Sequence, residues 1–163
     1  MEILSHPSPA LKAGTEEFDP TTDKDLGDLV RAMARAMYDA PGVGLAAPQL
    51  GILKRVCVYD IDDGLVALCN PRIVSSSEET VAEEEGCLSL PGIGVPIARS
   101  VSITCEALDL EGNPVTIEAS DLHARVLQHE IDHLDGVLII DRASPEDRRE
   151  VLRAYLQTLD RVG

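Results

Sequence analysis

The segment Gln128–His133 constrains this chain more than any other, because it places two histidines four residues apart with a glutamate directly after the first. On an α-helix, four residues advance by about 400°, so the side chains of His129 and His133 leave the same face about one turn apart. Two imidazole nitrogens can then bind one metal ion. Glu130 is offset by about 100° and can take a proton from a water at that ion. The segment therefore predicts a hydrolytic metal site on a helix.

A solvated helix can carry the same polar residues by chance, so this segment alone is only moderately specific. Its inner side is apolar, which is typical of a helix that packs centrally rather than at the surface. The apolar residues on that side are Leu122, Val126, Leu127, Ile131 and Leu134.

A third ligand is also needed, because a catalytic metal usually has three protein ligands and one open position for water. Cys57, Cys69 and Cys105 lie in strand-like surroundings, where a free thiol acts as a small apolar residue. Cys87 instead lies between a glycine and a Ser-Leu-Pro turn, where the backbone can approach a ligand. Cys87 is therefore the expected third ligand.

Small residues dominate the segment Gly42–Gln49, which indicates that another group approaches its backbone closely. Gln49 offers a neutral donor for a developing oxyanion. An ordinary glycine-rich loop between a helix and a strand is the alternative. A phosphate-binding loop is excluded, because no Gly-Lys-Ser/Thr sequence follows.

Taken together, these segments resemble the peptide deformylase family. The family motifs Gly-x-Gly-x-Ala-Ala-x-Gln, Glu-Gly-Cys-x-Ser and Gln-His-Glu-x-Asp-His match Gly42–Gln49, Glu85–Ser89 and Gln128–His133 in that order. The likeness runs from Ser5 to Arg142, nearly the whole chain. It implies a hydrolase in a bacterial cytoplasm that removes the N-formyl group from the formylmethionine of nascent polypeptides and releases formate.

The resemblance also implies the roles of the site residues. The two histidines and Cys87 hold one divalent ion, which is Fe(II) in the cell, although Zn, Ni or Co suit the same donors. Glu130 takes the proton of the attacking water and hands it to the leaving amine. The metal, the side-chain amide of Gln49 and the backbone N–H of Leu88 share the developing negative charge.

The implied substrate is an extended peptide that pairs its backbone with Val43 and Gly44 on one side and with Gly86 on the other. Its methionine side chain enters an apolar pocket. Taken singly, each apolar residue proposed for this pocket is as readily explained as part of the core. The pocket residues are Val43, Leu122, Val126 and the ring of His129.

Two positions depart from the family pattern. Relatives often carry an arginine shortly after Ser-Leu-Pro, near the substrate entrance, whereas the segment from Gly92 to Gly94 is uncharged here. Asp121 occupies a position where glycine is common and can serve as an N-cap. Arg99 and Asp132 can pair to fix the metal helix, or can be ordinary surface charges.

Length and composition predict a single domain, residues 1–163, with a core of aliphatic side chains, because aromatic residues make up only 2%. The chain has no apolar run of about 18 residues and no signal segment at its start, so we expect a cytoplasmic protein with reduced cysteines and no membrane contact. The net charge of −15 disfavours direct nucleic-acid binding. Ribosome contact is expected to be weak or transient, because Arg148, Arg149 and Arg153 near the end have acidic neighbours.

The order of elements predicts an α+β fold in which antiparallel sheets pack around the central metal-binding helix, with an N-terminal and a C-terminal helix. Ser75–Glu84 is expected to be an exposed connection. Ser120 or Asp121 is expected to cap the metal helix and Gly136 to end it. The other expected helices cover 25–38 and the residues from Ser144 or Pro145 onward, and the expected strands cover 56–61, 65–69, 101–108, 115–118 and 137–140.

Two other functions are compatible with the metal site. One is a metal-dependent amidase that acts on a different N-formyl substrate. The other is a non-catalytic metal-binding domain, which would be expected to have lost Glu130, Gln49 or a ligand, and none is lost.

Overall fold

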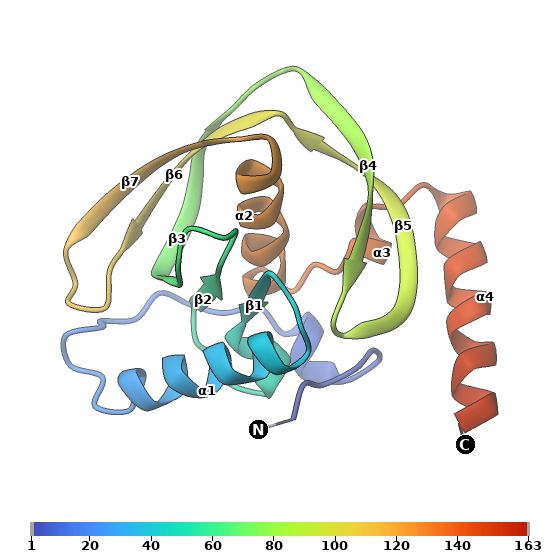
Figure 1. Ribbon diagram of the computed structural model, residues 1–163, viewed down its shortest axis with the longest axis horizontal. Coiled ribbons are helices and arrows are strands. Elements are labelled where there is room, and N and C mark those ends of the chain that lie inside the picture. The colour runs from blue at the N-terminus through green and yellow to red at the C-terminus, as the bar shows by residue number, and fades with distance from the viewer. Residues whose placement is uncertain (1, 163) are drawn as a thin grey trace.

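In the computed structural model, which describes residues 2–162, the chain forms two antiparallel sheets and several helices (Figure 1). The larger sheet has the strand order β1-β2-β3-β6-β7, and every neighbouring pair is antiparallel. The smaller sheet is the antiparallel pair β4-β5. This is the predicted α+β arrangement. The strands are β1 (Gly44–Ala46), β2 (Val56–Tyr59), β3 (Val66–Ser76), β4 (Thr80–Cys87), β5 (Leu90–Ser100), β6 (Ser102–Leu108) and β7 (Pro114–Ser120).

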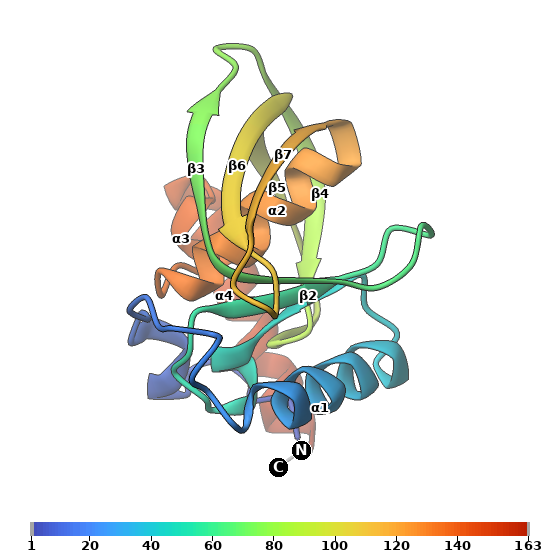
Figure 2. The ribbon, with the colours of Figure 1, turned by 90° about the vertical axis from the view of Figure 1, so that its left-hand side faces the viewer.

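Helix α2 lies between the larger sheet and the β4-β5 pair (Figures 1 and 2). No helix in the described part of the chain is both long enough and apolar enough to cross a membrane. The helices are α1 (Leu26–Asp39), α2 (Asp121–Leu134), α3 (Ile139–Arg142) and α4 (Pro145–Val162), and two 3₁₀ turns are η1 (Pro9–Lys12) and η2 (Ala47–Leu50).

The inner face of α2 is held by apolar packing. Leu127, Ile131 and Leu134 recur at helical spacing and are buried against strand residues, among them Cys57 and Leu68. Burial of each such side chain contributes about 1.5–3 kcal/mol to folding. This packing holds α2 against the larger sheet.

The C-terminal end of α2 is closed by Gly136, as predicted. The Val137 N–H donates to the carbonyl of Asp132 at 2.8 Å, and the Gly136 N–H donates to the carbonyl of His133 at 3.1 Å. These two bonds form a Schellman motif, which needs a positive φ at its glycine, and φ of Gly136 is 75°. A Cβ at this position would lie 2.7 Å from the carbonyl oxygen of Lys12, so the backbone of Lys12 passes too close to Gly136 to leave room for a side chain.

The predicted cap at the other end of α2 is wrong. Ser120 occupies the N-cap position, but its side chain makes no capping hydrogen bond. Asp121 is the first helical residue and adopts a φ of 54°. A left-handed backbone is one that glycine adopts without strain, so Asp121 begins the helix in a conformation that L side chains rarely adopt.

Two segments differ from the predicted elements. Ser75–Glu84 is largely strand rather than a connection, because β3 continues to Ser76 and β4 begins at Thr80. The predicted strand 137–140 is replaced by the helical turn α3, in which the side chain of Asp141 accepts a hydrogen bond from the Leu138 N–H at 2.9 Å. A short apolar run does not distinguish a strand from a buried helical turn.

The predicted terminal helices are confirmed as α1 and α4. The predicted strands 101–108 and 115–118 are confirmed as β6 and β7, which pair with each other as a hairpin. Five buried residues of α1 face the β1-β2 side of the core. Tyr155 of α4 is buried, and its hydroxyl donates to the carbonyl of His6 at 2.9 Å, which ties this helix to the N-terminal segment.

We predict that Gly136→Ala lowers the free energy of unfolding by about 2–4 kcal/mol, measured by urea unfolding. Strain at positive φ accounts for about 1 kcal/mol and the clash with Lys12 for the remainder. Gly64→Ala is the matched control, because Gly64 also has a positive φ of 99° but has no atom within 4 Å of its Cβ position. Equal losses in the two variants would contradict the argument from close approach.

Candidate metal centre

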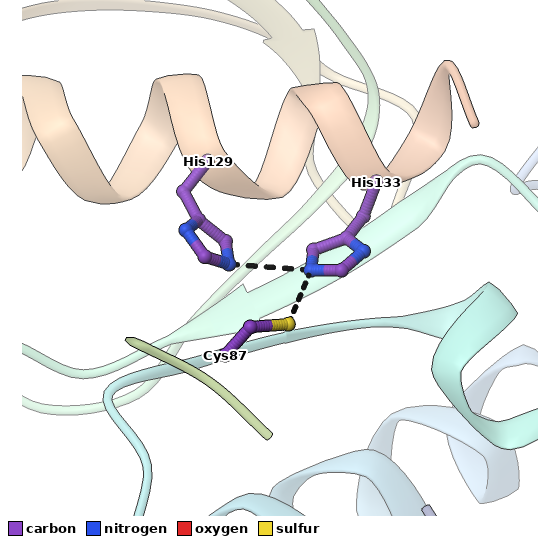
Figure 3. Close-up of side chains that lie close together, drawn as sticks. All are labelled: Cys87, His129 and His133. Carbon is purple, nitrogen blue, oxygen red and sulfur yellow. Dashed lines mark hydrogen bonds between the residues drawn. The ribbon is translucent and has the colours of Figure 1, made fainter. Parts of the chain in front are cut away.

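Three potential metal ligands converge from two elements. Cys87 is the last residue of β4, and His129 and His133 lie one turn apart on α2. The Nε2 atom of His133 lies 3.3 Å from the sulfur of Cys87 and 3.2 Å from Nε2 of His129 (Figure 3). The three ligating atoms all lie within 4.8 Å of one another.

This donor set fits a small divalent cation. Bonds of about 2.0–2.3 Å in tetrahedral geometry place donor atoms roughly 3.3–3.6 Å apart, close to the separations observed around His133. Nδ1 of His129 lies 2.9 Å from Oε1 of Glu85, so its Nε2 atom is the one that faces the other ligands. A carboxylate behind an imidazole fixes the ring and makes it a stronger donor. A bound cation would be held by Cys87 and the two histidines.

The electrostatic support of the centre is a buried network around Arg99. Its guanidinium donates twice to Glu85, at 2.9 Å each, and once to Asp132, at 2.6 Å. The Arg99–Asp132 pair is therefore present, and both residues are buried, which excludes the alternative of ordinary surface charges. Arg142 also binds Asp132, at 2.8 and 3.1 Å. The network connects β4 to α2 through charges that water does not screen.

Two further side chains attach α2 to the β4-β5 pair. Arg125 contacts Glu85 and donates to the carbonyls of Ile97 and Val81, at 3.0 and 2.7 Å. Gln128 accepts from the Ser100 N–H and donates to its carbonyl, both at 3.0 Å. The histidines and Cys87 are thus held by bonds between the elements that carry them.

These contacts shift the proton affinities of the centre. Burial alone would raise the pKa of Glu85, but hydrogen bonds from Arg99 and His129 outweigh it and lower the pKa to about 2. Burial alone would lower the pKa of His129, but its hydrogen bonds with Cys87 and Glu85 raise the pKa to about 10. Burial, and then the charge on His129, hold the pKa of His133 well below its usual range. Binding of a cation at Nε2 of His129 would therefore release a proton.

Glu130 is a buried carboxylate beside the ligands. Its Oε1 atom has no hydrogen-bond partner among the described residues. Burial raises the pKa of Glu130 to about 7, against the opposing charges of His129 and Arg99. A Cβ on Gly44 would lie 2.5 Å from its Oε2 atom, so only glycine leaves room for this carboxylate. The arrangement suits a group that accepts and returns a proton near neutral pH.

Gln49 lies on the other side of Cys87, in the turn η2. Its side-chain oxygen accepts from the Ala46 N–H at 3.0 Å, and its amide nitrogen donates to the hydroxyl of Ser89 at 3.1 Å. The same nitrogen lies 4.0 Å from the sulfur of Cys87. Gln49 is buried, and these bonds turn the donor end of its side chain toward the candidate ligands.

An open cleft of about 870 Å³ leads to the centre. Its walls come from the segment before β1, from the β4-β5 turn and from the first turns of α2. Every residue that the sequence analysis assigned to substrate or catalysis lies on this wall, together with the uncharged Gly94. These wall residues are Val43, Gly44, Gln49, Gly86, Leu88, Leu122, Val126 and Glu130.

The remaining thiols lie apart from the ligands, as predicted. Cys57, Cys69 and Cys105 are fully buried within the apolar core. Burial raises the pKa of each of these thiols, as expected of small apolar residues.

The sequence analysis missed the contributions of Glu85, Arg125 and Arg142. Glu85 was available from the strand pattern, because it precedes Cys87 by two residues and alternate residues of a strand share a face. The two arginines gave no local signal, since their partners lie on distant segments.

We predict that Glu85→Gln lowers the free energy of unfolding near neutral pH and that this loss disappears in acid. The pKa of Glu85 is below its ordinary value of 4.5, so the carboxylate stabilises the fold above pH 4.5 and loses this effect as pH falls toward about 2. The full contribution is about 3 kcal/mol. Urea unfolding of the wild type and the variant from pH 7 to pH 2.5 measures it, and a difference independent of pH would contradict the assignment.

Comparisons of the sequence and of the fold with known proteins all find peptide deformylases. The family model for polypeptide deformylase matches residues 1–149. A peptide deformylase of Acidothermus cellulolyticus is 49% identical over 138 residues, covering 83% of this chain and 76% of that protein. One of Thermodesulfovibrio yellowstonii is 44% identical over 163 residues, covering 97% of each. The crystal structure of a peptide deformylase from Legionella pneumophila has a TM-score of 0.91 at 40% identity and covers 99% of this chain and 95% of its own.

Proposed function

This chain belongs to the peptide deformylase family, and we propose that its Cys87, His129 and His133 hold the single metal ion of this metal-dependent hydrolase. The protein removes the N-formyl group from the N-terminal formylmethionine of nascent polypeptides and releases formate. The observation that carries the proposed site is the convergence of three ligating atoms beside the buried, unpartnered carboxylate oxygen of Glu130.

The identity of the metal is proposed from the chemistry of its donors. Thiolate and imidazole suit Fe(II), Zn, Ni or Co, and we propose Fe(II) in the cell. A bound divalent cation would polarise the formyl oxygen and increase the acidity of a neighbouring water.

Glu130 is the proposed general base and acid. Its Oε1 atom is free to accept a proton from the attacking water, and its raised pKa allows it to hold that proton. As the bond between the formyl carbon and nitrogen breaks, Glu130 passes the proton to the leaving amine. The products are formate and a free N-terminal methionine.

Two hydrogen-bond donors are proposed to stabilise the negative charge that develops on the formyl oxygen. The amide nitrogen of Gln49 is held in place by the bonds at both ends of its side chain. The backbone N–H of Leu88 follows the Cys87 ligand directly and lies on the cleft wall. Donors fixed before reaction stabilise a transition state without reorganising.

The peptide itself is proposed to lie extended in the cleft. Val43 and Gly44 would pair with one side of its backbone and Gly86 with the other. The methionine side chain would pack on Leu122 and Val126 beside the ring of His129. Leu122 is 57% exposed and Val43 is 52% exposed, which suits residues that a substrate covers.

We also propose that residues 1–163 form one deformylase domain in the cytoplasm and that contact with the ribosome is weak, without direct nucleic-acid binding. The net charge of −15 opposes approach to RNA phosphates. Arg148, one of the few cations near the C-terminus, is paired with Asp141 at 3.0 Å.

We predict that Cys87→Ser loses its metal, because a site with three ligands rarely retains an ion with two. Metal content after gel filtration, measured on protein purified without oxygen, tests this. Cys57→Ser is the matched control and should keep one ion per chain, because its thiol is in the core. Full metal retention in Cys87→Ser would rule out the proposed ligand.

Substitution of Glu130, the proposed base, should affect the rate of the reaction rather than metal binding. Glu130→Gln should keep the metal and bind formylmethionyl peptide, while its rate of formate release falls by roughly 10²–10⁴. Turnover near the wild-type rate would mean that another group moves the proton.

A further inference from the structure

We propose that the N-terminal segment, residues 3–6, positions the side chain of Gln49 for the reaction by tying its turn to Ser89. The inference deepens the proposed function, because it rests on Gln49 as a donor to the formyl oxygen. It concerns a part of the chain that contains neither a proposed metal ligand nor a proposed catalytic group.

Two backbone N–H groups of the N-terminal segment hold two separate parts of the site. The Leu4 N–H donates to the carbonyl of Gln49 at 2.7 Å, and the His6 N–H donates to the carbonyl of Ser89 at 2.8 Å. In Figure 1 the start of the chain runs below the turn between β4 and β5. The segment therefore joins η2, which carries Gln49, to the β4-β5 turn, which carries Ser89.

These two bonds hold both partners of the contact that orients the Gln49 amide. The amide nitrogen of Gln49 donates to the hydroxyl of Ser89 at 3.1 Å. Both residues are buried, at 2% and 0% exposure. A shift of η2 relative to the β4-β5 turn would therefore break a hydrogen bond between buried groups, which costs free energy. The place of the amide nitrogen beside Cys87 thus depends on the N-terminal segment.

Helix α4 in turn holds the N-terminal segment. Tyr155 is buried, and its hydroxyl donates to the carbonyl of His6 at 2.9 Å. Leu4 packs against the same apolar cluster as Tyr155, whereas Ile3 packs against the cluster that joins α1 to η2. A continuous series of contacts therefore runs from α4 through His6 to Ser89 and Gln49.

Loosening of the N-terminal segment should slow turnover rather than weaken metal binding. Loss of a whole oxyanion donor costs about 10²–10³ in turnover, and misplacement of a group by about 1 Å can cost about 10². A partly released Gln49 should therefore lower kcat by about 5-fold to 50-fold. KM should stay within about 2-fold of the wild-type value, because the bond to the formyl oxygen strengthens mainly as charge develops.

Leu4→Pro tests the bond to Gln49 directly, because proline has no backbone N–H. Leu4→Ala is the matched control, since it shortens the side chain but keeps the N–H. In the metal-loaded enzyme, kcat for formate release from formylmethionyl peptide should fall in Leu4→Pro and stay near the wild-type value in Leu4→Ala. The Ala46 N–H, which binds the side-chain oxygen of Gln49, should exchange its hydrogen faster in Leu4→Pro only, measured by NMR without substrate.

Tyr155→Phe is a milder variant, because it removes one hydroxyl and keeps the ring in the core. It should lower kcat by about 2-fold to 10-fold, a smaller loss than that of Leu4→Pro because the segment keeps both of its own bonds to the site. Tyr59→Phe is the matched control. It also removes a hydroxyl from a buried tyrosine, but this hydroxyl lies 3.0 Å from His123 on α2, so kcat should not change.

The decisive comparison repeats both substitutions in protein that carries Gln49→Leu. If the N-terminal segment acts through Gln49, Leu4→Pro and Tyr155→Phe should each add less than about 2-fold to the loss that Gln49→Leu causes, since effects on one interaction are not additive. Losses as large in this background as in the wild type would overturn the proposal, as would wild-type kcat in both variants. Absence of formate from the wild type, with faster Ala46 exchange in Leu4→Pro, would instead overturn the proposed function and leave the positioning of Gln49 in place.

Discussion

The buried ion pairs of Arg99 are the interaction on which the rest of the site depends. This guanidinium is 5% exposed and binds Glu85 on β4 and Asp132 on α2. Loss of one partner in such a network leaves an uncompensated buried charge, which typically costs about 3–5 kcal/mol. Because Glu85 also holds the ring of His129, the same charge that joins the two elements orients a proposed metal ligand. Stability of the fold and geometry of the centre are therefore coupled.

The β4-β5 pair combines two proposed tasks, metal ligation and contact with the substrate. Its strand β4 ends in Cys87, a proposed metal ligand, and presents Gly86 and Glu84 along the same cleft wall. A shift of this strand would move the proposed ligand and the proposed peptide-binding edge together. The bonds of Arg125 and Gln128 to β5 and to Val81 oppose such a shift. Preorganisation of this kind is what electrostatic catalysis requires.

The sequence predicted the elements whose signals are local. Periodic apolar residues identify α1, α2 and α4, and Gly136 marks the end of α2, because a left-handed residue closes a Schellman motif. Ser75–Glu84 was misread because its polar residues belong to long, solvated strand ends whose pairing partners are far along the chain. The helical turn α3 was misread as a strand because Asp141 and the pairing of Arg142 with Asp132, rather than its apolar residues, decide its conformation.

For the site, the sequence by itself determined which side chains are candidate metal ligands. The one-turn spacing of His129 and His133 and the glycine next to Cys87 are local features, so they can be recognised without the tertiary structure. Tertiary structure alone decided which charges surround them. Arg125 binds a carboxylate 40 residues away and Arg99 one 33 residues away, and no short-range pattern encodes such pairings. It also decided that Gln49 turns its donor end toward Cys87, because Ser89 and Ala46 hold the amide in that orientation. Local periodicity specifies which side chains share a face, whereas the packing of distant segments specifies what each face meets.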